Sequence, residues 1–194
     1  MASTTPLEAA ASARDGAPRD DEIMRRGAGS LKKYALSAFS AGPSKPGCIV
    51  KTSTGHNLAT DLPKPAGGAD EAAQPVELML AALLGCKTAT AHFVARHLWA
   101  RPHNKIAFIT FEDVVAERDE RGALTLPITD EPPITAALTR VTGIARVRPV
   151  DAASISAASV EKLGELVEQR CPVAATLVAA GTKLEFEWLL DDSS

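Results

Sequence analysis

The chain has 194 residues, of which 45% are hydrophobic and 23% are charged, and its formal net charge is −3 at pH 7. This composition is ordinary for a globular protein with one sizeable core, and the slightly acidic balance argues against a surface that binds nucleic acid or an anionic membrane. No apolar run reaches the roughly 18 to 20 residues that a membrane span requires. The N-terminal sequence lacks the pattern of a secretory signal, so we expect a cytoplasmic protein.

The distribution of large apolar residues predicts three segments. Residues 1–30 are rich in Ala, Ser, Gly, Asp and Arg, and they cannot bury enough apolar surface to offset the entropy of ordering them. We therefore expect a mobile tail over 1–30, a single domain over 31–190 and a short solvated tail over 191–194.

The domain begins with residues that alternate between apolar and polar, which predicts strands over 34–39, 48–54 and 56–62. Short connections rich in Pro and Gly separate these strands, so we expect an antiparallel meander. After a loop, Pro75 suits the first turn of a long Ala- and Leu-rich helix that runs to about residue 100. Gly85 weakens a helix by about 1 kcal/mol relative to Ala, so a break or kink is expected near Gly85-Cys86.

The second half of the domain predicts further strands over 106–117, 123–126, 138–148 and 183–190. Two helices precede the last strand. The first is capped by Ser159 and ends before Pro172, and the second runs from Pro172 to Ala180 with Gly181 as its stop. This order of strands and helices predicts the α+β class.

The three cysteines, Cys48, Cys86 and Cys171, match no zinc-ligand spacing, and a disulfide framework is not expected in a cytoplasmic chain. His92 and His97 are five residues apart, which does not place them on one helical face. We therefore expect no metal and no bound cofactor. Cys48 has no partner at redox spacing and is interpreted as a packing residue.

The other two cysteines are candidate redox residues. Cys171 precedes the predicted helix at Pro172, where unpaired N–H groups and the helix dipole lower a thiol pKa. Cys86 would also open a helical segment if the long helix breaks at Gly85, with Lys87 beside it. A thiolate can reduce a peroxide and become a sulfenic acid, which a second thiol converts to a disulfide. The alternative is that both are inert packing residues, since the sequence alone does not show that they meet.

Two motifs carry a resemblance to a known family. The segment Gly67-Gly68-Ala69-Asp70, followed by Gln74-Pro75-Val76-Glu77 and the run to Gly85-Cys86, resembles the signature of the OsmC/Ohr family of osmotically inducible and organic hydroperoxide resistance proteins. Cys171-Pro172-Val173, followed by a short helix and a last strand, resembles the second-cysteine motif of that family. The resemblance extends from about Leu31 to Leu190.

The resemblance implies an OsmC-like fold, in which antiparallel sheets wrap around a long central cysteine-bearing helix, and an intertwined homodimer with active sites at the subunit interface. It implies reduction of organic hydroperoxides, with Cys86 as the peroxidatic cysteine and Cys171 as the resolving cysteine. A dithiol reductant such as a lipoyl protein would reopen the disulfide. Leu80, Leu83 and Phe93 are candidate walls of a pocket for an alkyl hydroperoxide.

The catalytic Arg–Glu pair of the family is matched only in part. Members usually carry Glu directly after the Pro, whereas this chain has Val76 there and Glu77 one place later. Glu77 is our candidate for that role, and on an unbroken helix it would lie on the side opposite Cys86, so that only a kink would bring the two together. Residues 42–62 contain no Arg, and candidate substitutes are Lys45, Lys51, His56 and the Arg25-Arg26 pair.

Two other functions are weighed against the peroxidase. One is a non-enzymatic dimer of the same fold that binds a small apolar ligand or senses redox state, and the missing Arg is the feature that favours it. The other is a zinc or nucleotide enzyme, for which the sequence contains no motif.

Overall fold

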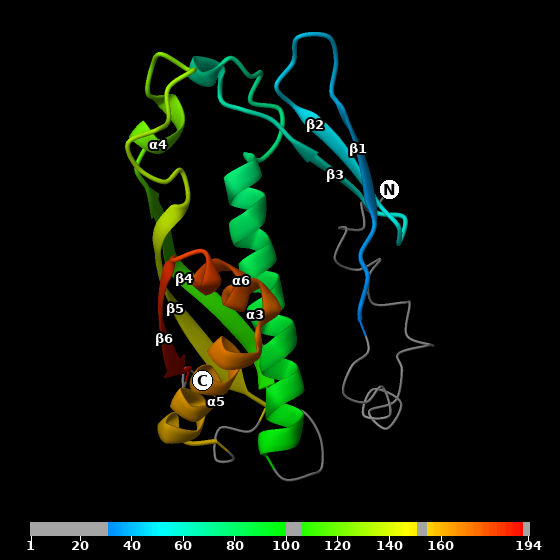
Figure 1. Cartoon of the computed structure of the whole chain (residues 1–194). Helices are drawn as coiled ribbons and strands as arrows, with labels where there is room; N and C mark the ends of the chain where they lie inside the picture. Colours follow the sequence, from blue (N-terminus) through cyan, green and yellow to red (C-terminus); the bar gives the residue numbers. More distant parts are fainter. Residues whose placement is uncertain (1–30, 100–105, 151–154, 192–194) are drawn as a thin grey trace. The chain divides into compact units, whose positions relative to one another are not determined.

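The computed structural model describes residues 31–99, 106–150 and 155–191 (Figure 1). The predicted tail over 1–30 lies outside the described residues. In chain order the described elements are β1 (Leu36–Ser40), β2 (Cys48–Thr52), β3 (Asn57–Thr60), η2 (Lys64–Ala66), α3 (Pro75–Leu98), β4 (Ile106–Arg118), α4 (Arg121–Leu124), β5 (Leu138–Pro149), α5 (Ala157–Arg170), α6 (Pro172–Ala179) and β6 (Lys183–Leu190). This mixture of helices with two three-stranded sheets confirms the predicted α+β class.

The chain forms two compact units. Of the described residues, the smaller unit contains 31–39 and Val50–Leu58, and the larger unit contains Ser40–Ile49 and those that follow from Ala59. Both cysteines of the predicted redox site, Cys86 and Cys171, belong to the larger unit.

The first sheet has the strand order β1-β2-β3 that the sequence predicts. The Ala41 N–H donates to the Gly47 carbonyl at 2.8 Å across one connection, and the Thr52 N–H donates to the His56 carbonyl at 2.9 Å across the other. Gly55, in the second turn, has a φ of 91°, a left-handed conformation that suits glycine. Connections this short allow only antiparallel pairing, so the predicted meander is confirmed.

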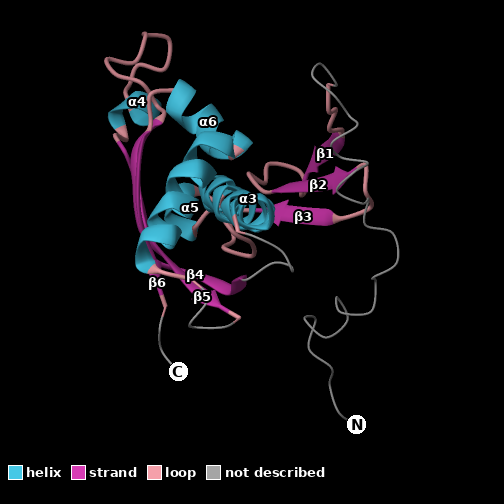
Figure 2. Cartoon of the chain, turned by 90° about the horizontal axis from the view of Figure 1, so that it is seen from below, coloured by secondary structure: helices cyan, strands magenta, loops and turns pink. Residues whose placement is uncertain are grey.

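The second sheet has the strand order β4-β5-β6 and belongs to the larger unit. β4 pairs antiparallel with β5, whereas β5 pairs parallel with β6. A parallel pair needs a long crossover connection, and α5 and α6 provide it between the two strands. Figure 2 shows α3, α5 and α6 on one face of this sheet.

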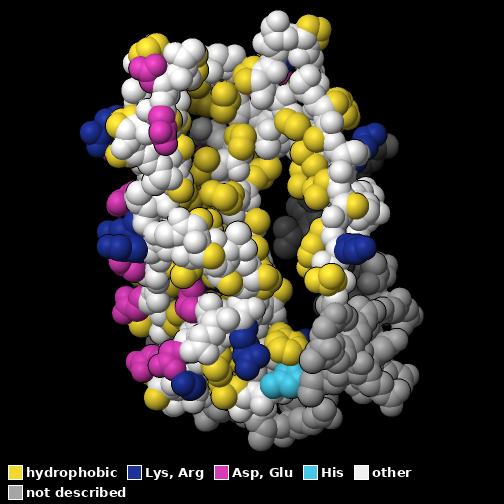
Figure 3. Space-filling view, viewed as in Figure 1, with side chains coloured by type: hydrophobic (Ala, Val, Ile, Leu, Met, Phe, Trp, Pro, Cys, Tyr) yellow, Lys and Arg dark blue, Asp and Glu magenta, His cyan; other side chains and the backbone are white. Residues whose placement is uncertain are grey.

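Buried and exposed side chains alternate along β5, as expected for a strand that is covered on one face. Val141, Ala145 and Val147 are fully buried under the helices. The opposite face carries arginines that pair across strands, as in the 2.8 Å contact between Arg146 Nε and Glu112 Oε2. Charged side chains accordingly gather along the side of the molecule where this sheet lies (Figure 3). The predicted strands β5 and β6 are confirmed.

Helix α3 is unbroken from Pro75 to Leu98, so the predicted break near Gly85-Cys86 is wrong. Its start is fixed by Pro75 in the first turn and by a capping box between Gln74 and Glu77. A cap contributes about 1 kcal/mol, similar to the helix-weakening effect of one glycine. Packing of the buried face against the rest of the larger unit then decides in favour of a continuous helix.

By length and composition α3 is the one described helix that could cross a membrane, a test that core helices of globular proteins also pass. It packs against α5, α6 and β4 within the larger unit. Its buried residues, Leu83, Lys87, Ala91, Val94 and Ala95, follow helical spacing along one side.

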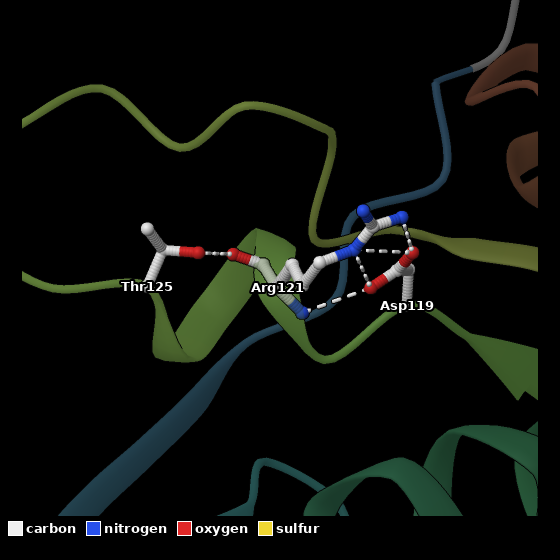
Figure 4. A network of polar contacts seen from close by, with 3 residues as sticks. All are labelled: Asp119, Arg121 and Thr125. Atoms are coloured by element: carbon white, nitrogen blue, oxygen red, sulfur yellow. Dashed lines mark hydrogen bonds and ion pairs between the residues drawn. The ribbon is translucent and has the colours of Figure 1, made fainter.

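Two local predictions are corrected by side-chain hydrogen bonds to the backbone. The strand predicted over 123–126 is instead a single helical turn, α4, where the Asp119 carboxylate accepts from the Arg121 backbone N–H at 2.9 Å and also from its guanidinium (Figure 4). The cap of α5 is Ser156 rather than Ser159, because Ser156 Oγ accepts from the Ser159 N–H at 3.3 Å. Such local bonds compete with strand formation and set helix starts.

Gly164 of α5 lies close against Trp188 of β6, and this close packing generates a stability prediction. A Cβ at Gly164 would lie 2.4 Å from Trp188 Cγ. We therefore expect Gly164→Ala to destabilise the fold by about 1 to 3 kcal/mol through overpacking, although alanine favours helix. Urea unfolding measures the change, with Gln169→Ala on the exposed side of α5 as the control. An unchanged or raised stability of Gly164→Ala would contradict this packing.

Candidate redox site

Cys171 lies at the junction of α5 and α6. Its N–H donates to the Val167 carbonyl at 2.9 Å and closes α5, and its sulfur accepts from the Ala174 N–H at 3.5 Å and caps α6. Pro172 forces this break, because a proline disfavours helical angles in the residue before it. The prediction that Cys171 stands at a helix start is confirmed.

The surroundings of Cys171 are mostly hydrocarbon. Its side chain is fully buried in a cluster with Leu83, Leu138, Val141, Ala174 and Leu177. Burial raises the pKa of the Cys171 thiol and outweighs the backbone N–H groups of Ala174 and Val173, which act in the opposite direction. The predicted lowering of this pKa is therefore wrong in its net direction, because the sequence shows the helix start but not the cavity around it.

Cys86 lies in the middle of α3 and is half-buried, so the helix-start argument does not apply to it. Its side chain packs against the same apolar cluster as Cys171. The neighbouring Cys86 also raises the pKa of Cys171. Both residues are free thiols. The structure thus brings together two sulfurs that are far apart in the sequence.

Glu77 does not join this site. Its Oε2 accepts from the Gln74 backbone N–H at 2.8 Å, so it caps the start of α3. At about 100° per residue, Glu77 lies on the opposite side of the helix from Cys86. In the structure Glu77 therefore acts as a capping residue, and a catalytic role for it stays a prediction.

The site contains a buried cation that sequence analysis missed. Lys87 is fully buried, its ammonium is hydrogen-bonded to Glu168 Oε1, and the nitrogen lies 4.2 Å from the centroid of the Phe186 ring. The indole N–H of Trp188 donates to the same carboxylate oxygen at 3.3 Å. The signal was present in the sequence, since Lys87 lies four residues from both Leu83 and Ala91 on the apolar stripe of the helix.

The proposed substitutes for the missing Arg lie in different parts of the chain. Lys51 and His56 are exposed in the smaller unit, and Arg25-Arg26 lie outside the described residues. Lys45 and Asp61 line a cavity of about 390 Å³ in the larger unit.

Asp61 organises the loop that leads to α3 and that carries the first family-like motif. Its carboxylate accepts from the backbone N–H groups of Leu62, Ala69 and Glu71 at 2.8 to 3.1 Å, and these bonds, led by that of Glu71, lower its pKa. A Cβ at Gly68 would lie 1.8 Å from the Leu62 carbonyl oxygen, so only glycine fits there.

The predicted pocket walls separate into two groups. Leu80 and Leu83 pack in the cluster that contains the cysteines, whereas Phe93 packs in the other core cluster, with its ring 4.5 Å from that of His97. Trp188 is a core residue. Among the described residues, no group of three or more His, Cys, Asp or Glu side chains could hold a metal ion.

The fold and the site together define a mixed α+β protein in which a long helix and a helix junction bring two free thiols to one apolar cluster. A family model described as OsmC-like protein matches residues 67–187, which include both cysteines. The chain belongs to the OsmC-like family, so the resemblance based on the two motifs is confirmed. A search by sequence finds no significant match among curated proteins.

Solved structures share the fold at low sequence identity. An OsmC-like protein from Mycoplasma pneumoniae is 19% identical with a TM-score of 0.61, covering 82% of this chain and 97% of its own. An OsmC-like protein of unknown function from Vibrio cholerae is 11% identical with a TM-score of 0.62, covering 83% and 100%. An organic hydroperoxide resistance protein from Elizabethkingia anophelis is 19% identical with a TM-score of 0.55, covering 86% and 100%.

The raised pKa of Cys171 predicts how this thiol responds to pH. In a Cys48→Ser/Cys86→Ser background, we expect iodoacetamide to modify Cys171 only above the ordinary thiol range of about pH 8.5, because burial remains the main cause of the shift. Mass spectrometry across a pH series measures the rate. Alkylation of the folded chain at neutral pH as fast as that of the urea-unfolded chain would contradict the assignment.

The same shift affects stability with a defined sign. The folded chain favours the neutral thiol, so this stabilisation is complete below the ordinary thiol pKa and is lost as the pH rises through the raised value. In urea unfolding of the reduced protein, Cys171→Ala should lack this alkaline decrease.

Proposed function

We propose that this protein is a thiol-dependent peroxidase that reduces organic hydroperoxides, with Cys86 as the peroxidatic residue and Cys171 as the resolving residue. The observation that carries the proposal is that a half-buried Cys86 packs against the apolar cluster that contains the fully buried Cys171. Membership of the OsmC-like family supports a peroxide-related redox role.

The reaction has three steps. Cys86, as a thiolate, attacks the terminal oxygen of the hydroperoxide, the O–O bond breaks, and the alcohol leaves after taking up a proton, so that Cys86 becomes a sulfenic acid. The Cys171 sulfur then attacks the Cys86 sulfur, and the thiol proton and the sulfenic hydroxyl leave as water while the S–S bond forms. A dithiol reductant such as a lipoyl protein reduces this disulfide and is itself oxidised to a disulfide.

The difference in burial supports this division of roles. Cys86 retains some exposure, so a peroxide can reach it, whereas Cys171 has none. Because burial raises the pKa of Cys171, this residue remains a thiol and competes poorly for peroxide. Leu80 and Leu83 line the surroundings of Cys86 with hydrocarbon, which suits an alkyl group of the substrate.

We include a cytoplasmic homodimer in the proposal. Within the described chain, Val76, Met79 and Leu98 of α3 expose between 36% and 38% of their surfaces. These residues lie at the two ends of α3, in line with its buried stripe, so a second copy that covers the ends of the helix would remove these apolar side chains from water.

A non-enzymatic dimer that senses redox state or binds a small apolar ligand is the alternative. The raised pKa of Cys171 favours it, because a buried neutral thiol is also what an inert core cysteine presents. Reaction with a stoichiometric peroxide distinguishes the two functions.

We expect the reduced protein to lose two thiols per chain after one equivalent of cumene hydroperoxide, as measured with a thiol reagent under denaturing conditions. Cys86→Ser should abolish the loss, since no sulfenic acid then forms. Cys171→Ser should still consume one peroxide but accumulate sulfenic or over-oxidised Cys86, which mass spectrometry detects.

Cys48→Ser is the matched control and should leave the two-thiol loss unchanged, because Cys48 lies on β2 and belongs to neither core cluster. No thiol loss in the wild type would argue for the non-enzymatic alternative. Peroxide consumption that persists in Cys86→Ser, or ordinary multiple turnover in Cys171→Ser, would argue for different redox residues.

A further inference from the structure

Each partner of the ion pair between the fully buried Lys87 and the partly buried Glu168 neighbours one of the two cysteines. Lys87 directly follows Cys86 on α3, and Glu168 lies about one helical turn before Cys171 on α5. The hydrogen bond from Lys87 Nζ to Glu168 Oε1 therefore joins α3, which carries Cys86, to α5, which Cys171 closes.

We propose that Lys87 and Glu168 form a positioning pair for the dithiol, which holds α3 against the end of α5 so that Cys86 and Cys171 stay within reach of disulfide closure. The kinetic part of this inference rests on the proposed peroxidase function. The equilibrium part requires only that the two cysteines can form a disulfide.

Two further contacts, one to each partner, fix the geometry of the pair. The carboxylate oxygen that receives the Lys87 ammonium also accepts from the Trp188 indole N–H at 3.3 Å. The ammonium lies over the Phe186 ring, with 4.2 Å between the nitrogen and the ring centroid. Because both β6 aromatics belong to the sheet under the helices, the pair is tied to the sheet as well as to both helices.

Directional bonds are needed here because apolar contacts alone tolerate sliding between helices. A disulfide forms only when the two Cα atoms are about 4.4 to 6.8 Å apart, and a misplacement of about 1 Å can slow a reaction roughly a hundredfold. A buried ion pair contributes little net stability compared with apolar residues of similar volume, but it can specify register. Register between α3 and the α5–α6 junction is what the dithiol requires.

The equilibrium test measures disulfide formation in glutathione redox buffers, in a Cys48→Ser background. Oxidised glutathione takes two electrons from the two thiols and becomes two reduced glutathione molecules, and alkylation followed by mass spectrometry gives the oxidised fraction. We expect Lys87→Met and Glu168→Gln each to lower the equilibrium constant about tenfold, a coupling typical of neighbouring residues in one network.

The matched control is Glu165→Gln, which removes the exposed ion pair with Lys162 on the same helix and should leave the constant unchanged. A single variant leaves one charge buried without its partner and can weaken the fold, so the double variant Lys87→Met/Glu168→Leu replaces the pair with apolar side chains. We expect this double variant to unfold cooperatively and still to show the lowered constant. A wild-type constant in the folded double variant would overturn the proposal.

Stopped-flow kinetics with cumene hydroperoxide separate positioning from a general loss of structure. Sulfenic acid formation, which depends on peroxide concentration, should change less than about threefold in Glu168→Gln, while the concentration-independent closure step should slow about tenfold or more. Equal slowing of both steps would count against a positioning role.

The two proposals fail in different ways. If the wild type forms the disulfide in glutathione buffers but does not react with peroxide, the peroxidase function is wrong. The equilibrium constants alone then decide the positioning role. If the wild type reduces peroxide and all variants close as fast as the wild type, the positioning role is wrong and the function stands.

Discussion

The arrangement of the larger unit depends on one buried charge. The Lys87 ammonium is fully removed from water, and an ammonium in that position is tolerated only with a carboxylate and hydrogen-bond partners around it. Because 31% of the Glu168 side chain is exposed, removing one partner costs at most the roughly 3 to 5 kcal/mol typical of fully buried pairs. The pair also lies between the two core clusters of the unit, since Phe186, over which the ammonium sits, packs against both. A displacement of α3 relative to α5 would therefore separate the charges and disturb both clusters.

The same arrangement makes the two thiols unequal. Pro172 is the first residue of α6, and it disfavours helical angles in Cys171, which therefore ends α5. Cys171 thus lies at a helix start, where backbone N–H groups face its side chain. An exposed cysteine at that position would become a better anion, but here the helices close over it and burial raises its pKa. A buried, neutral thiol suits reaction with an adjacent oxidised sulfur rather than with a peroxide from solution. Burial excludes reagents from solution, whereas an attack within the molecule needs no access from solvent.

Much of the fold follows from local patterns, whereas the site depends on contacts that no local pattern contains. Alternation located β5 and β6, and Pro172 located the start of α6, because these features reflect one-sided burial and fixed backbone angles. The break predicted at Gly85 is absent from α3, because tertiary packing outweighs a difference in helix propensity of about 1 kcal/mol. The role of Lys87 escaped prediction because its partner is 81 residues away along the chain.

The exposed side of α3 is relevant to the proposed homodimer. A helix that is apolar nearly all round needs cover on both sides. Within the described chain, its buried stripe faces the larger unit, while Ala81, Ala82, Gly85 and Ala89 are exposed. Small residues on an exposed helix side allow another backbone to approach closely, and a Cβ at Gly85 would meet no atom within 4 Å. A helix shaped in this way fits the proposed homodimer, in which the second copy would lie close to Cys86 and would limit the size of any peroxide that reaches the sulfur.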